Sequence, residues 1–202
     1  MKRRSEPTDP LRSAAVLGID PGSQATGWGV VCGPSSAPRL VAAGVIRLPS
    51  GLAFAPRLHL LQVKLAEVVE RHAPGSAGVE APFHGASARA ALQLAHARGV
   101  TLAVLAGASV EVFEYSPATV KKSVTGNGRA GKQQVARMVR SLLGGPPQAL
   151  AELDGLQAGD RADALAVALC HLASCGRDRL HKPLTRRRAA GGEVVNLIPL
   201  RR

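Results

Sequence analysis

The chain has 202 residues, a formal net charge of +12 and an isoelectric point near 11.0. Its 46% hydrophobic content excludes a wholly disordered chain, no uncharged apolar run reaches membrane-spanning length, and the basic start lacks the apolar stretch of a secretory signal. An odd cysteine count of 3 suits a reducing cytoplasm, and so large a positive charge indicates a polyanionic partner, most simply a nucleic acid.

In chain order, the first segment is a basic, proline-containing tail over residues 1–13. Three apolar segments follow, separated by Gly, Pro and Ser, and they predict strands at 14–20, 26–32 and 40–48. A parallel crossover needs a dozen residues or more, which these connections do not have. The three strands are therefore predicted to form an antiparallel meander.

From Ala55 the apolar spacing becomes helical, and this helix is expected to stop at Pro74. Two short apolar segments beyond it predict further strands, at 77–80 and 110–115. Between those strands lies an alanine-rich helix over 86–98, which continues or restarts over 100–106.

The remaining segments are basic and then apolar. In order, they predict a short helix at 118–124, a mobile glycine-rich loop at 125–131, an amphipathic helix at 132–143 and a last helix at 160–175. Residues 14–176 therefore form one α/β domain, with a mixed five-stranded sheet flanked by helices: the meander plus two parallel strands. Residues 177–202 are predicted to be a basic, disordered tail.

Four carboxylates stand out. Asp20 and Glu80 each end a predicted strand, at the edge where open α/β sheets bind ligands. Asp160 and Asp163 lie three residues apart in the first turn of the last helix and so share a face. Four converging carboxylates would repel one another unless cations lay between them, and oxygen ligands without His or Cys suit Mg²⁺ or Mn²⁺. Beside a basic surface, this set predicts two-metal hydrolysis of a phosphodiester.

Simpler interpretations exist for the separate pieces. An Asp at a helix start is often only a cap. The segment 126–132 nearly matches the sequence motif of a nucleotide-binding phosphate loop, but Gln133 replaces the Ser or Thr that would bind Mg²⁺. Cys170, His171 and Cys175 could suggest a metal site, but without a second cluster the two cysteines are better interpreted as small buried residues.

Four segments carry a family pattern: 17–30 (LGIDPGSQATGWGV), 79–83 with 92–99, 120–135, and 160–168 with His171. Together they resemble the RuvC family of bacterial Holliday-junction resolvases, in the RNase H-like superfamily. The first segment alone would also suit actin-like proteins, whereas the third and fourth are specific to this family. The resemblance runs from Val16 to His171 without a large gap.

The resemblance implies an RNase H-like fold in which Asp20, Glu80, Asp160 and Asp163 bind two Mg²⁺ ions, with Mn²⁺ able to substitute. It implies a homodimer that nicks two opposed strands of a four-way DNA junction during recombination and repair. It also implies a cytoplasmic protein that works beside the branch-migration motor of RuvA and RuvB.

The same resemblance implies DNA contacts. Phe83 would stack on bases at the crossover or wedge between them, and Lys132 would lie nearest the scissile phosphate and take part in catalysis. The sequence departs from the family at Ala81, Pro82 and Ser87, which surround that phenylalanine. The predicted DNA-binding set is Phe83, Lys121, Lys122, Asn127, Arg129 and Lys132.

Two rival functions fit parts of the pattern. A non-catalytic, structure-selective DNA-binding protein would keep the basic surface, with the acids as remnants. An actin-like ATP-binding enzyme would need a second, similar phosphate loop in a longer chain, and none is found in the 202 residues.

Overall fold

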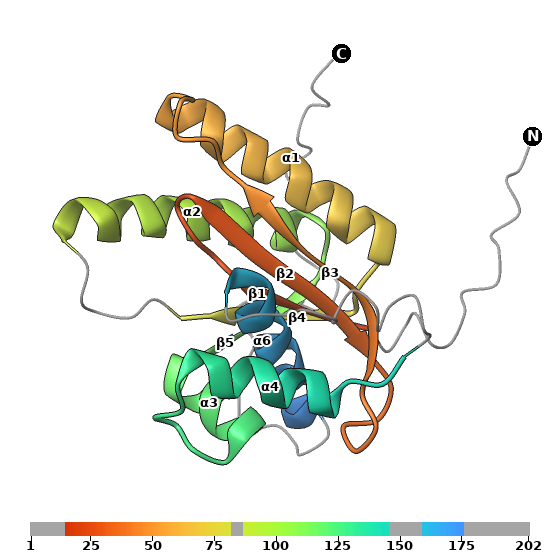
Figure 1. Ribbon diagram of the computed structural model, residues 1–202. Coiled ribbons are helices and arrows are strands. Elements are labelled where there is room, and N and C mark those ends of the chain that lie inside the picture. Colours follow the sequence, from red (N-terminus) through yellow and green to blue (C-terminus); the bar gives the residue numbers. More distant parts are fainter. Residues whose placement is uncertain (1–14, 82–86, 146–158, 176–202) are drawn as a thin grey trace, which may run out of the picture.

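The computed structural model describes residues 15–81, 87–145 and 159–175 (Figure 1). Its sheet has the strand order β3-β2-β1-β4-β5. The pairs β1–β2 and β2–β3 are antiparallel, and the pairs β1–β4 and β4–β5 are parallel, which confirms the predicted meander and mixed sheet. The strands are β1 (Val16–Asp20), β2 (Ala25–Cys32), β3 (Arg39–Arg47), β4 (Ser76–Glu80) and β5 (Glu111–Tyr115).

Helices cover both faces of this sheet (Figure 1). One face carries α1 (Phe54–His72) and α2 (Ala88–Gly107), and the other carries α3 (Pro117–Thr125), α4 (Lys132–Leu142) and α6 (Asp160–Cys175). Side chains alternate along a strand. In β1, Val16 therefore enters the core under α6, whereas Leu17 enters the core under α1 and α2.

Helix α6 lies directly on the backbone of the sheet because glycines stand beneath it. A β-carbon on Gly18 would collide with the carbonyl oxygen of Ala164 and the amide of Ala168. A β-carbon on Gly27 would collide with the carbonyl of Asp160. The first turn of α6 is thus placed over β2, at the end of the strand pair where Asp20 lies.

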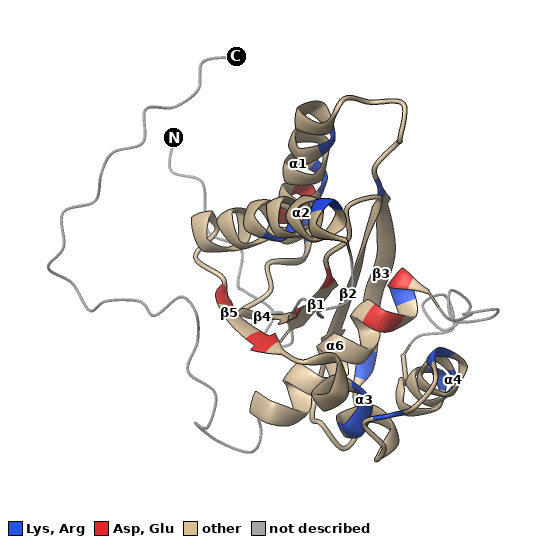
Figure 2. Cartoon of the chain, turned by 90° about the vertical axis from the view of Figure 1, so that its left-hand side faces the viewer, with Lys and Arg blue, Asp and Glu red and all other residues tan. Residues whose placement is uncertain are grey.

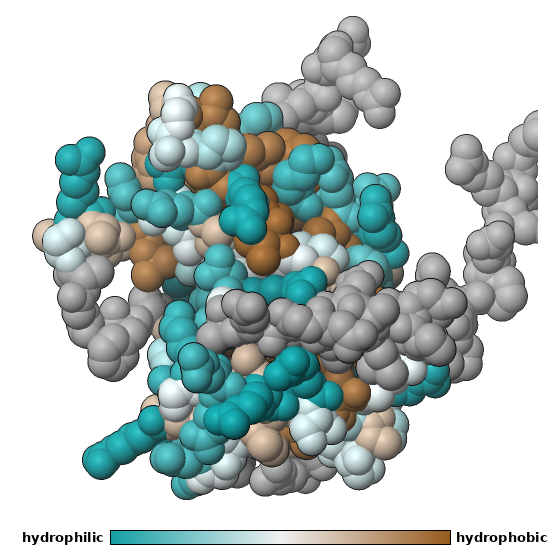
Figure 3. Space-filling model, viewed as in Figure 1, coloured by the Kyte–Doolittle hydropathy of each residue, from teal (hydrophilic) through white to brown (hydrophobic). Residues whose placement is uncertain are grey.

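Helix α2 is one continuous helix through Gly99, and it exposes much apolar surface. Leu92 is 62% exposed, and Figure 3 shows hydrophobic side chains gathered on the upper part of the molecule, the part that holds α1 and α2. By length and composition α2 could cross a membrane, with 17% of its apolar window buried, although Arg89 and Arg98 interrupt its apolar residues. A single helix of this kind is weak evidence for a membrane span.

The mobility expected of the loop at 125–131 stays a prediction; in the structure the Arg129 amide donates to the Asn127 side-chain oxygen over 3.0 Å, and Ala130 is 2% exposed. One local expectation differs from the structure. Cys175 is exposed at the end of α6, whereas Cys170 is buried as predicted. The apolar periodicity of a helix does not show where its last turn leaves the sheet.

Candidate active site

Two of the predicted carboxylates lie side by side at one edge of the sheet. Asp20 is the last residue of β1 and Glu80 the last of β4, and these parallel strands are paired with Ile19 opposite Val79. Both side chains are half-buried. The strand ends therefore deliver two acids to the carboxyl edge, as expected from the sequence.

The other two carboxylates come from the start of α6. Asp160 and Asp163 both lie in its first turn, where the positive end of the helix dipole favours negative charge. The amide of Asp163 donates to the Gly159 carbonyl over 3.0 Å, which closes that turn. Because Gly27 admits the helix so closely, this turn reaches the strand end that carries Asp20.

The electrostatics show that the four acids converge. Burial raises the pKa of Asp20 to about 8, with further contributions from Glu80, Asp163 and Asp160. Burial, and then the charge of Asp163, raises the pKa of Glu80 to about 7. Desolvation and repulsion by neighbouring carboxylates each favour the protonated form, and here the two act together.

Two lysines face these acids. Lys132 begins α4, and its Nζ lies 3.5 Å from Oδ2 of Asp163 while its side chain stays 71% exposed. Lys121 on α3 is half-buried, and with Lys132 it counteracts the rise in the pKa of Glu80 and Asp163. Figure 2 shows the acidic start of α6 beside basic residues of α3 and α4.

Three of the acids, Asp20, Glu80 and Asp163, line one pocket of about 500 Å³ together with the two lysines, between the sheet edge, α3, α4 and α6; Asp160 is not among its lining residues. Sequence reasoning missed Ser116, which lines the pocket and caps α3 by accepting from the Thr119 amide over 3.2 Å. The signal was present, since Ser followed by Pro117 is a typical helix start. The charged or hydroxyl-bearing lining residues are Asp20, Glu80, Ser116, Lys121, Lys132 and Asp163.

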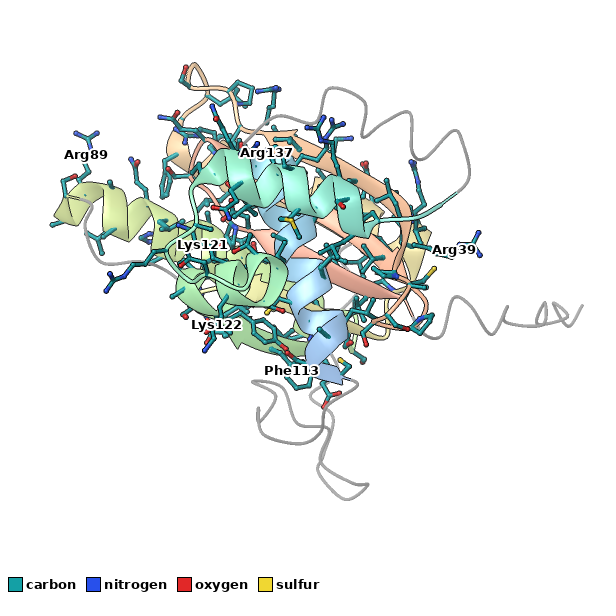
Figure 4. All side chains as sticks on the ribbon, turned by 60° about the horizontal axis from the view of Figure 1, so that its bottom comes forward. Arg39, Arg89, Phe113, Lys121, Lys122 and Arg137 are labelled. Carbon is teal, nitrogen blue, oxygen red and sulfur yellow. The ribbon has the colours of Figure 1, made fainter. Side chains whose placement is uncertain are left out.

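Other predicted site residues lie elsewhere. Lys122 and Arg129 are exposed and do not line the pocket, so the structure places them on the surface around it; Figure 4 labels Lys121 and Lys122 on α3. The side-chain Oδ1 of Asn127 accepts a hydrogen bond from the Arg129 amide within the loop. Phe83 lies outside the described residues.

The acids suit a hard divalent cation, because Mg²⁺ and Mn²⁺ prefer carboxylate oxygens as ligands. Such a cation would also relieve the electrostatic repulsion between the acids. Within residues 15–81, 87–145 and 159–175, however, no group of three or more His, Cys, Asp or Glu side chains is arranged so that it could hold a metal ion. Lys132 instead stands against Asp163. The acids would therefore have to rearrange in order to share a cation.

Comparisons with known proteins identify relatives of this chain. The family model described as crossover junction endodeoxyribonuclease RuvC matches residues 16–171. The RuvC of Alkalilimnicola ehrlichii is 47% identical over 157 residues, covering 78% of this chain and 90% of that protein. The RuvC of Anaeromyxobacter dehalogenans is 49% identical over 158 residues, covering 78% and 80%.

A solved structure of Thermus thermophilus RuvC in complex with a Holliday junction superposes with a TM-score of 0.71 at 32% identity, covering 85% of this chain and 99% of that one. The yeast mitochondrial resolvase Ydc2 shares the fold, with a TM-score of 0.61 at 17% identity. The expected RNase H-like architecture is thereby confirmed. With a family model over most of the domain and relatives near half identity, the chain belongs to the RuvC family of crossover junction endodeoxyribonucleases.

Proposed function

We propose that this endonuclease resolves Holliday junctions by nicking two opposed strands symmetrically, in a reaction that depends on Mg²⁺. The observation that carries the proposal is the meeting of acids from β1, β4 and α6 with lysines from α3 and α4 in one pocket. An acidic centre within a basic surface suits a phosphodiester, since the lysines attract the phosphates that carboxylates alone would repel.

Asp20, Glu80, Asp160 and Asp163 are proposed to hold the metal, with two ions per site and Mn²⁺ able to substitute. The bound ions would supply an activated water and stabilise the leaving oxygen. Asp20, whose pKa is affected by the charges of Glu80, Asp163 and Asp160, would be one of the ligands. Asp163 is already oriented by its contact with Lys132.

The remaining polar groups would bind and orient the DNA. Lys132 is exposed enough to leave Asp163 and face negative charge that develops on the phosphate. Lys121, Lys122, Asn127 and Arg129 would contact phosphates along α3 and the loop that follows it. The stacking role of Phe83 stays a proposal from the family resemblance.

Symmetric nicking requires two active sites, and we propose that the protein acts as a homodimer. The exposed apolar side chains of α2, Leu92 among them, are the described surface that best suits burial by a second copy. Work in the cytoplasm beside the RuvA and RuvB motor is proposed from family membership alone.

The test is cleavage of a synthetic four-way junction, with linear duplex as the control, with and without Mg²⁺ or Mn²⁺. We expect paired, symmetric nicks in the junction only, and only with metal. Asp163→Asn should abolish cleavage while junction binding stays within about threefold. Tight binding with no nicks under either metal would instead support a non-catalytic junction-binding protein, and cleavage by the Asp163 variant would refute the metal assignment.

A further inference from the structure

A buried histidine joins α6, which carries Asp160 and Asp163, to β4, which carries Glu80, and to the neighbouring strand β5. His171 on α6 is 0% exposed. Its Nδ1 lies 2.9 Å from the hydroxyl of Tyr115 on β5, and its Nε2 lies 2.8 Å from the hydroxyl of Ser76 on β4. Both ring nitrogens thus have a hydroxyl partner, which offsets the cost of burying a polar ring.

The two partners of the ring lie on the strands that place Glu80. Ser76 begins β4 and Glu80 ends it. Tyr115 is the register partner of Glu80, and its carbonyl accepts from the Ala81 amide over 2.9 Å. The end of β4 is therefore held by the same tyrosine whose hydroxyl contacts His171.

The ring also has a fixed position on the sheet. A β-carbon on Gly78 would lie 2.9 Å from the β-carbon of His171, so the helix sits against the bare backbone of β4 there. The Phe113 ring packs against the imidazole, with centroids 4.9 Å apart. Asp163 lies eight residues earlier on the same helix, about 12 Å away along its axis.

We propose that His171 is a positioning residue: its two hydrogen bonds fix where α6 lies along β4 and β5, and so hold Asp160 and Asp163 at the right distance from Glu80. An apolar side chain of similar size could fill the same space. It would lose both hydrogen bonds and keep only hydrophobic contact, which is not directional, so the placement of the helix along the strand would be less sharply defined. The inference rests on the proposed assignment of these carboxylates as metal ligands.

The test compares His171→Leu, which keeps a similar volume, with Tyr115→Phe, which removes the hydroxyl that meets Nδ1 of the histidine. The control is Thr101→Val, which removes a buried hydroxyl that donates to the Ala97 carbonyl on α2, across the sheet. Mn²⁺ affinity is measured directly from the electron paramagnetic resonance signal of free Mn²⁺. Thermal unfolding and single-turnover junction cleavage are recorded on the same samples.

We expect both test variants to weaken Mn²⁺ binding at least fivefold and to slow cleavage, while metal-free junction binding stays within twofold. Thr101→Val should lower the melting temperature without changing Mn²⁺ affinity. Normal Mn²⁺ affinity in folded Tyr115→Phe, or in folded His171→Leu, would overturn the positioning role. A different failure, in which Asp163→Asn binds Mn²⁺ as tightly as the wild type, would refute the proposed metal site itself.

Discussion

At the scale of single residues, lysines of the same basic surface differ in their distance from the acids of the pocket. Lys132 stands 3.5 Å from Asp163, whereas Lys122 points to solvent outside the pocket although it also belongs to the basic surface. Charge alone does not separate these two residues, but their distance from the acids does.

Replacing Lys132 with Met should therefore slow single-turnover cleavage about 100-fold, the usual loss when one group that stabilises developing charge is removed. The measurement uses saturating protein with Mg²⁺, so that binding does not limit the rate. Lys122→Met is the matched control and should cleave within about threefold of the wild type. Equal rates for the two variants would remove Lys132 from the catalytic step.

His171 offers a prediction on stability. Burial lowers its pKa to about 4 in the folded protein from an ordinary 6.5, so the folded state holds the ring neutral. Below pH 6.5 the unfolded chain binds a proton that the folded one does not, so stability falls as the pH drops and the loss is complete only below pH 4. The slope is at most about 1.4 kcal/mol per pH unit, and about 3 kcal/mol in total.

Urea unfolding at pH 7.5 and pH 5.5 checks this, with wild type compared against His171→Asn. The carboxylates titrate in both proteins, so the difference between the two isolates the histidine. Wild type should lose about 1 kcal/mol more than the variant over this interval. A variant that loses as much as the wild type would show that the ring is already protonated in the folded state.

At the scale of elements, the strands and helices followed from local patterns. Apolar runs bounded by Gly and Pro marked β1 to β3, and the change to helical spacing marked α1. The four carboxylates were found because each stands at an element end. What the sequence did not show were contacts between distant segments: the hydroxyls that meet His171, and the helix that lies over Gly27. A glycine in a strand indicates that another part of the chain packs closely there, but it does not show which part.

That close approach predicts a sensitive position. Gly27→Ala would force the first turn of α6 away from β2, since the new methyl group meets backbone and not a flexible side chain. We expect a loss of about 1–3 kcal/mol in unfolding free energy, as for other overpacked sites. Cleavage should fall further than stability explains, because the displaced turn carries Asp160 and Asp163.

Gly51→Ala is the control, since nothing lies within 4 Å of the added methyl group there. Its unfolding free energy should stay within about 0.5 kcal/mol of the wild type, as for other surface changes. Urea unfolding and junction cleavage are measured on both variants. A Gly27 variant that folds as stably and cleaves as fast as the control would mean that α6 can shift on the sheet without harm to the site.

At the scale of the whole molecule, charge is distributed unevenly. The chain carries +12 overall, yet the pocket gathers half-buried acids. The stretch from residue 116 to 150 holds six Lys or Arg and no acid, and its described part forms α3 and α4 beside the acids. A junction bound there would be held mainly through phosphates, whose neutralisation releases counterions.

Junction binding without metal should therefore weaken steeply with salt. If all six basic residues of that stretch met phosphates, one protomer would give a slope of log K against log salt of about −5, at about −0.9 per contact. Lys122→Met should make the slope shallower by about 0.9. Lys64→Met should not change it, because Lys64 lies on α1, on the other face of the sheet, where it pairs with Glu67 at 3.0 Å. If both variants changed the slope equally, the net charge of the protein would attract the DNA, and the surface of α3 and α4 would have no special part in binding.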